Sequence, residues 1–168
     1  MDDSKSTMVI AIETIEKSCD LCEDYARSQE SKPIAVLCCE GACLRGEVAR
    51  RAANLLCFAL APELAARICL GSAFTKDAGQ RRLVEKANKA LVLEGCFLRC
   101  ASRMMAGAAK NPRLETVIVD ELYDFDQRLF GCDQVADHEI DTFARVAAGK
   151  VLDSFTTRQG TWRSDRTL

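Results

Sequence analysis

Four short apolar runs, each followed by a segment with helical spacing, constrain the fold of this chain most strongly. They lie near residues 34–37, 67–70, 91–93 and 116–119. The runs are continuous, which is typical of strands buried on both faces of a parallel sheet. Because strands that alternate with helices form right-handed crossover units, we predict a three-layer α/β fold with a mainly parallel sheet of about four strands and helices on both faces.

The segments around these runs show the apolar spacing of helices. An amphipathic helix is expected over residues 6–29, with a short strand over residues 8–12 as the competing interpretation. Further helices are expected over residues 44–60, 77–89 with Thr75 as N-cap, 97–110 and 137–153. The N-terminal helix and the 137–153 helix should lie on the outside. We divide the chain into an N-terminal helix with a C-x-x-C motif (1–31), a cysteine-rich α/β domain (32–155) and a flexible tail (156–168).

Cysteine is the anomaly of the composition, with ten residues in a chain of 168. In a reducing compartment such a number indicates metal binding or thiol chemistry more than a disulfide framework. The alternative is that cysteine serves as a small buried side chain. Cys57, inside an apolar helical run, is the clearest case of that alternative.

Charge and hydropathy narrow the class of protein and its partners. A net charge of -2 gives no reason to expect nucleic acid. The first residues are acidic and polar, unlike a secretory signal, and the longest apolar stretch, residues 55–62, is far shorter than the roughly 20 residues of a membrane helix. We therefore expect a cytoplasmic protein that binds a metal ion and neither nucleic acid nor membrane, with no protein partner indicated. His138 is the single histidine, which excludes a His-rich metal site within one chain.

Three of the expected strands deliver cysteines to their carboxyl ends, and two more cysteines stand near the starts of the following helices. In chain order these residues are Cys38, Cys39, Cys43, Cys69, Cys96 and Cys100. The carboxyl ends of parallel strands meet at one edge of a sheet, where ligands bind in such folds. If residues 97–107 are helical, Cys96 lies at the edge of that helix with Cys100 one turn further along. Helix N-termini at this edge are expected to lower the pKa of nearby thiols, that of Cys39 included.

A separate pair, Cys19 and Cys22, has the C-x-x-C spacing of a metal knuckle or a redox pair. On the expected N-terminal helix both residues could equally be packed in the core. We slightly favour core packing, because the apolar stripe from Met8 to Ala26 needs apolar residues at both positions.

The cysteine-containing turns resemble those of the DGC-domain family, which is named for an Asp-Gly-Cys motif. Cys39-Glu40-Gly41-Ala42 resembles its first Cys-x-Gly turn, and Cys69-Leu70 resembles its second cysteine. Glu94-Gly95-Cys96 stands where the family has its naming motif, with Glu94 in place of Asp. Cys96-Phe97-Leu98-Arg99-Cys100-Ala101 resembles the C-x-x-x-C-A pattern that follows. The resemblance covers roughly residues 34–119.

The resemblance implies a zinc-binding protein with four ligands, Cys39, Cys69, Cys96 and Cys100, and it carries no enzymatic activity. Four thiolates suit tetrahedral zinc, and the same four could hold an iron–sulfur cluster. A third hypothesis is thiol-redox or sulfur-transfer chemistry with Cys96 or Cys39 as the reactive thiolate. We therefore expect a cysteine-rich zinc protein with no biological role indicated, and the other two as alternatives.

Overall fold

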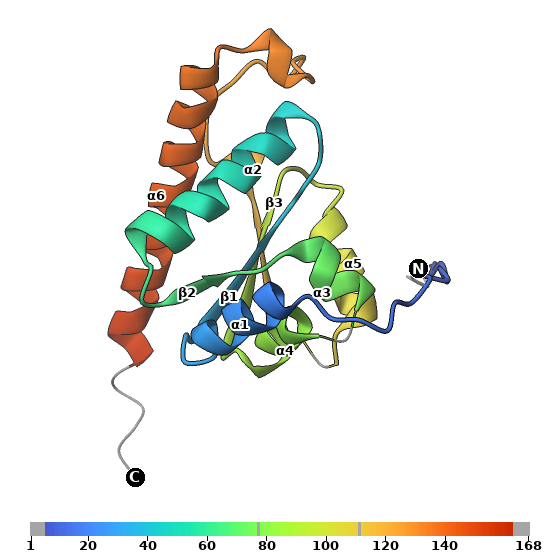
Figure 1. Ribbon diagram of the computed structural model, residues 1–168. Helices are drawn as coiled ribbons and strands as arrows, with labels where there is room; N and C mark the ends of the chain where they lie inside the picture. Colours follow the sequence, from blue (N-terminus) through green and yellow to red (C-terminus); the bar gives the residue numbers. More distant parts are fainter. Residues whose placement is uncertain (1–5, 77, 111, 163–168) are drawn as a thin grey trace.

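The structure is a computed structural model that describes residues 6–76, 78–110 and 112–162. One sheet of four parallel strands lies at its centre, in the order β2-β1-β3-β4 (Figure 1). The strands are β1 (Ile34–Cys38), β2 (Ala65–Arg67), β3 (Lys89–Glu94) and β4 (Leu114–Ile118). The predicted α/β class and four-stranded parallel sheet are confirmed.

Helices cover both faces of the sheet, as predicted. Their bounds are α1 (Asp20–Gln29), α2 (Leu44–Leu55), α3 (Leu70–Thr75), α4 (Gly79–Lys86), α5 (Cys100–Ala108) and α6 (Asp137–Trp162). A π-helical turn, η1 (Leu56–Leu60), continues α2, and two short 3-10 turns are η2 (Val119–Glu121) and η3 (Cys132–Gln134). α2 and α6 pack on one face, and α1, α3, α4 and α5 on the other (Figure 1). No helix in the described ranges is long and apolar enough to cross a membrane.

The two central strands are buried on both faces, which explains their continuous apolar sequence. Val36 and Leu91 belong to the core beneath α2 and α6, whereas Leu37 and Val92 belong to the core beneath α3, α4 and α5. All four side chains are fully buried. Each such burial stabilises the fold by about 1.5–3 kcal/mol, so the sheet is a rigid platform for the loops at its carboxyl edge.

Polar contacts fix the first turn of α2 against the segment that follows β4. The Arg45 guanidinium lies 3.1 Å from the Asp120 carboxylate and also donates to the carbonyls of Gln127 and Leu129. It stacks over the ring of Phe125 at 4.8 Å from the centroid. The N-terminus of α2 is therefore held at the carboxyl edge of the sheet.

The N-terminal helix is shorter than predicted, because α1 begins only at Asp20. Residues 6–19 form neither helix nor strand, so the competing strand interpretation is wrong as well. Met8 and Ile15 of the expected apolar stripe are 79% and 69% exposed, and only Ala26 of that stripe is buried. The segment is rich in β-branched residues, which disfavour helix, and a helix needs a packing surface that this segment does not find.

Three boundaries around the second and third strands differ from the predictions. β2 ends at Arg67, and Leu70 already begins α3, so Cys69 is a helix N-cap and not the end of a strand. Thr75 ends α3 and donates its hydroxyl to the Gly71 carbonyl at 2.7 Å, which excludes its expected role as N-cap of the next helix. The helix after β3 begins at Cys100, three residues later than expected.

The remaining differences between predicted and observed bounds concern α4, β4 and α6, whose ends have weak signals in the sequence. α4 begins at Gly79, and its expected start, Asp77, lies outside the described residues. β4 begins and ends slightly earlier than predicted. α6 continues to Trp162, beyond the expected end at Asp153, and thus includes the start of the segment expected to be a flexible tail. Residues 163–168 of that tail lie outside the described residues.

Candidate functional site

Three glycines bring the loop after β1, the first turn of α2 and the loop after β3 into close contact. A Cβ atom on Gly46 would overlap the backbone of Gly41. A Cβ atom on Gly95 would lie 2.9 Å from backbone atoms of Arg45 and Gly46. Because no side chain fits at either position, the backbone segments can touch directly. The cysteines that flank these glycines are thereby held at the carboxyl edge, between β1 and β3.

Cys39 stands at the centre of this arrangement. Its half-buried Sγ accepts a hydrogen bond from the Gly41 N–H at 3.4 Å, and the N–H of Gly95 also points toward it. The sulfurs of Cys39 and Cys43 both lie within 4 Å of the point that a Cβ on Gly41 would occupy. Cys100 is close enough to Cys39 for their charges to interact. Three of the thiols at this edge therefore share one neighbourhood.

Burial raises the pKa of Cys39, and this effect outweighs the N–H groups of Gly41 and Gly95, which lower it. The neighbouring Glu94 and Cys100 raise the pKa further. The expected lowering of the Cys39 pKa by helix N-termini is therefore wrong. A Cys39 thiol without a bound cation is protonated at neutral pH and is a weak nucleophile.

Glu94 determines how α5 starts. Its side chain is 1% exposed, and its carboxylate accepts the backbone N–H groups of Ser102 at 2.6 Å and Ala101 at 3.3 Å. These are orphan donors of the first turn of α5, where negative charge is favourable. Arg99, just before the helix, has φ 52°, the single positive φ among non-glycine residues of the described ranges. The turn between β3 and α5 is thus tightly specified.

This turn changes the expected relation between Cys96 and Cys100. Cys96 lies in the turn, and its carbonyl accepts the N–H of Arg99 at 3.2 Å, whereas Cys100 is the first residue of α5. The two cysteines are therefore not one helical turn apart on a common helix. Sequence reasoning left the role of Glu94 open, although strand alternation already placed it on the α5 side of β3, together with Val92.

Cys69, the remaining predicted ligand, has a different thiol neighbour. It is exposed at the N-cap of α3, and its charge interacts with that of Cys22 in α1. Within the described residues, no three His, Cys, Asp or Glu side chains already stand in an arrangement that could hold a metal ion. The ligand set Cys39, Cys69, Cys96 and Cys100 therefore stays a prediction.

Arg67 is a residue of this edge that sequence reasoning missed. Its guanidinium donates to the buried Cys38 sulfur and to the Glu40 carboxylate, both at 2.7 Å. Burial raises the pKa of Cys38 far above its ordinary value. Cys38 is therefore a structural thiol that, with Arg67, fixes the beginning of the loop that carries Cys39. A charged residue inside an otherwise apolar run was the signal for this contact.

The comparisons with known proteins identify the family. The family model of the DGC domain matches residues 35–145, which is more than half of the chain. The chain belongs to the DGC-domain family. Its DGC domain runs from β1 into α6 and contains every cysteine except Cys19 and Cys22. The comparisons with curated proteins and with solved structures found no match.

Of the two remaining cysteines of the DGC domain, Cys57 lies away from this edge and Cys132 lies beside it. Cys57 is buried in the core beneath α2 and α6, as predicted, and burial raises its pKa to about 12. Cys132 approaches Cys43, which pairs with Gly131 through an isolated antiparallel bridge. The bridge attaches the loop before α6 to the loop that carries Cys39 and Cys43.

A second thiol group precedes the DGC domain, at the start of α1. Cys19 is the N-cap of α1 and is exposed, and Cys22 is half-buried. Core packing, the interpretation favoured slightly from the sequence, is therefore wrong for Cys19. The backbone N–H of Cys22 points toward the Cys19 sulfur but does not complete a capping hydrogen bond. This N–H group, the Cys22 thiol and the Leu21 N–H together lower the pKa of Cys19. The pKa of Cys22 is raised, chiefly because its thiol donates to Cys19.

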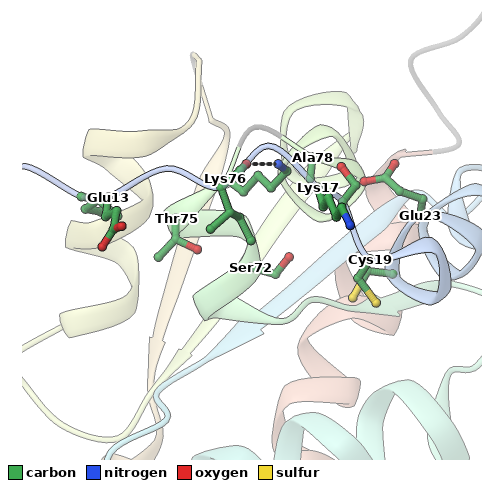
Figure 2. Close-up of a pocket in the computed structure, with 12 residues that line it drawn as sticks. Glu13, Lys17, Cys19, Glu23, Ser72, Thr75, Lys76 and Ala78 are labelled. Carbon is green, nitrogen blue, oxygen red and sulfur yellow. Dashed lines mark hydrogen bonds between the residues drawn. The ribbon is translucent and has the colours of Figure 1, made fainter.

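Both cysteines line a cavity of about 430 Å³. Its walls are residues 12–19, the start of α1 and the region of α3 and α4 (Figure 2). Figure 2 shows Cys19 at one end of this cavity and Glu13 at the other, with Ser72 and Thr75 between them. The Lys76 ammonium donates to the carbonyl of Ile15 at 2.7 Å and so holds the N-terminal segment beside α3.

Proposed function

We propose that the DGC domain binds one zinc ion through four cysteine thiolates, Cys39, Cys69, Cys96 and Cys100, at the carboxyl edge of the sheet. The observation that carries the proposal is the setting of Cys39. Its half-buried sulfur faces the N–H groups of Gly41 and Gly95 and has Cys100 nearby. Backbone N–H groups stabilise a thiolate, and a bound cation offsets the cost of burying its charge.

The donor set fits zinc. Zinc accepts four thiolates in tetrahedral geometry, and structural sites of this kind are closed by protein ligands alone. When bound, zinc would cross-link segments that are distant in sequence, namely the loop after β1, the N-cap of α3, and the β3–α5 turn with the start of α5. The family resemblance points to the same four residues. The protein's own part is to position the thiols, through the glycine contacts around Gly41 and the Glu94 carboxylate at the start of α5.

Cys69 and Cys43 compete for the position of fourth ligand. Cys69 is the ligand that the family resemblance implies, and its side chain is exposed at the N-cap of α3. Cys43 shares with Cys39 the space beside Gly41. We assign Cys69 as ligand and Cys43 as a neighbour that the metal does not require.

Elemental analysis of freshly purified full-length protein, beside its visible spectrum, tests the proposal. A colourless sample with about one zinc per chain, the stoichiometry of a closed four-thiolate site, supports it. A brown sample with iron and sulfide supports the iron–sulfur alternative and contradicts zinc. A sample with neither metal, even after zinc is added to reduced protein, contradicts metal binding and leaves thiol chemistry as the remaining hypothesis.

Matched cysteine variants then test the ligands. Cys96→Ser should release the ion and lower the melting temperature in a way that added zinc does not restore, whereas Cys57→Ser should keep its zinc, because Cys57 lies in the apolar core. Cys69→Ser should lose zinc and Cys43→Ser should retain it. The reverse result for the last two would make Cys43 the ligand and remove Cys69 from the site.

A further inference from the structure

We propose that Cys19 and Cys22 form a reversible dithiol–disulfide pair that exchanges with external disulfides, with Cys19 as the attacking thiol and Cys22 as the resolving thiol. The pair precedes the residues that match the DGC family and contains none of the proposed zinc ligands, of which Cys69 lies near Cys22. The inference therefore does not depend on zinc binding.

The backbone brings the two thiols to a distance at which they can bond. Cys19 is the N-cap of α1 and Cys22 is the third residue of the helix, so the two are neighbours on its first turn. The two thiols lie close enough to interact, line the same cavity and are both free. Residues three apart on a helix have Cα atoms within the range that a disulfide spans.

The two cysteines differ in exposure in the way that such a pair requires. Cys19 is exposed and can meet an incoming disulfide, whereas Cys22 is half-buried and can reach a partner mainly through Cys19. The backbone N–H groups of Leu21 and Cys22 surround the Cys19 sulfur and favour a thiolate at that position. The first residue of the pair is thus the accessible nucleophile.

α1 is anchored firmly enough to keep Cys22 in place while Cys19 reacts. The Glu23 carboxylate accepts the Gly79 N–H at 2.9 Å and pairs with Arg82 at 2.8 Å. The Tyr25 hydroxyl donates to the Arg67 carbonyl at 2.8 Å, and Ala26 is buried against α4. Residues 6–19, by contrast, have no regular structure, and the hydrogen bond from Lys76 to Ile15 holds them beside α3.

The cavity beside the pair accommodates the substrate. Ser72 and Thr75 supply hydroxyl groups to its lining, and Lys17 supplies an ammonium group near Cys19 (Figure 2). The Lys17 ammonium suits a carboxylate of a small disulfide, and the Glu13 carboxylate suits an amino group of the same molecule. Glutathione disulfide, which carries both groups, is the simplest probe.

The exchange balances in two steps. The Cys19 thiolate attacks one sulfur of the external disulfide, whose S–S bond breaks, and one thiolate leaves and takes up a proton. Cys22 then gives its proton to solvent and attacks the Cys19 sulfur, which breaks the mixed disulfide and releases the second thiolate. Two electrons and two protons pass from the pair to the external disulfide, which ends as two thiols. An external dithiol reverses the reaction.

The test uses reduced full-length protein treated with glutathione disulfide, followed by blocking of free thiols, tryptic digestion and mass spectrometry. Cleavage after Lys17 and Arg27 gives a peptide, residues 18–27, that contains Cys19 and Cys22 and no other cysteine. In the wild-type protein this peptide should carry no blocking group and should be two hydrogen atoms lighter than the reduced, unblocked peptide. In Cys22→Ser the same peptide should keep one glutathione on Cys19. In Cys19→Ser, Cys22 should react at least about tenfold more slowly, because it is less exposed and lacks the helix-end N–H groups.

Several results would overturn the proposal. A wild-type peptide that stays reduced, or that carries two glutathiones, would show that the pair does not close. A disulfide between Cys22 and Cys69, which lie near each other, would assign Cys22 to another partner. If one added zinc ion per pair protected both Cys19 and Cys22 from the thiol-blocking reagent, the two residues would form a metal site. Cys57→Ser serves as control and should leave the peptide's reaction unchanged.

Discussion

Replacing Gly46 by alanine tests whether the loop after β1 rests directly on the first turn of α2. Gly46 lies inside α2, where alanine is favoured over glycine by about 1 kcal/mol. The added methyl group, however, would lie 2.9 Å from the Cα and carbonyl carbon of Gly41 and would overlap its carbonyl oxygen. These are backbone atoms of a short loop, which cannot rotate away as a flexible side chain can.

The two effects oppose each other, and the clash should win. Overpacking of this kind costs about 1–3 kcal/mol or somewhat more, against a helix gain of about 1 kcal/mol. We expect a net loss of about 1–2 kcal/mol, which for a chain of this size lowers the melting temperature by about 2–8 °C. Because Gly41 lies beside the Cys39 sulfur, the same variant should also bind the proposed zinc ion less tightly.

Gly149→Ala is the matched control. Gly149 lies inside α6, and a Cβ there would meet no atom within 4 Å. The same change should therefore stabilise the protein by up to about 1 kcal/mol and leave zinc retention unchanged. Thermal melts of both variants followed by circular dichroism, together with zinc retention against a chelator, measure the difference. A Gly46→Ala protein as stable as the wild type or more stable would refute the close backbone contact.

Two further substitutions test polar contacts. Hydrogen bonds and charges from Arg50 and Arg51 lower the pKa of Glu47 from 4.5 to about 2. A lowered folded-state pKa stabilises the protein above the unfolded value, and this contribution is lost as pH falls from about 4.5 toward 2. Glu47→Gln should therefore cost about 1–2 kcal/mol at pH 7 and little near pH 2, measured by urea unfolding across that range. Glu94→Gln should cost about 1–3 kcal/mol at neutral pH, because the amide cannot replace a carboxylate that accepts two buried N–H groups of α5.

The sheet could be predicted from the sequence because burial on both faces leaves a local signature. Residues 34–37 and 91–93 are apolar without interruption, and these runs lie within the two central strands. The short strand β2 sits at the edge of the sheet, so its limits depend on pairing with β1 and were misplaced. The N-terminal segment was misread for a different reason. Its apolar spacing suits a helix, but spacing alone does not supply a surface for that helix to pack on.

The candidate site could be predicted only in outline. The sequence places cysteines at strand ends, and parallel pairing brings those ends to one edge. Which thiols become neighbours depends on the strand order β2-β1-β3-β4, on the close backbone contacts of Gly46 and Gly95, and on the left-handed turn at Arg99. None of these features has a local sequence pattern. The sequence therefore placed Cys39, Cys43 and Cys100 at one edge of the sheet, but it did not show that Cys69 has Cys22 as a thiol neighbour.

Arg67 links the two thiol groups mechanically. Its carbonyl accepts the Tyr25 hydroxyl of α1, which carries Cys22, while its guanidinium holds Cys38, the residue before Cys39. Arg67 also stands two residues before Cys69, whose backbone N–H is fixed by the Gln80 side chain at 3.1 Å. A shift at the end of β2 would therefore be transmitted to α1 on one side and to the β1 loop on the other. Because a side chain takes part in each of these hydrogen bonds, Arg67 supports both the proposed redox pair and the proposed zinc ligands, although the two groups have no cysteine in common.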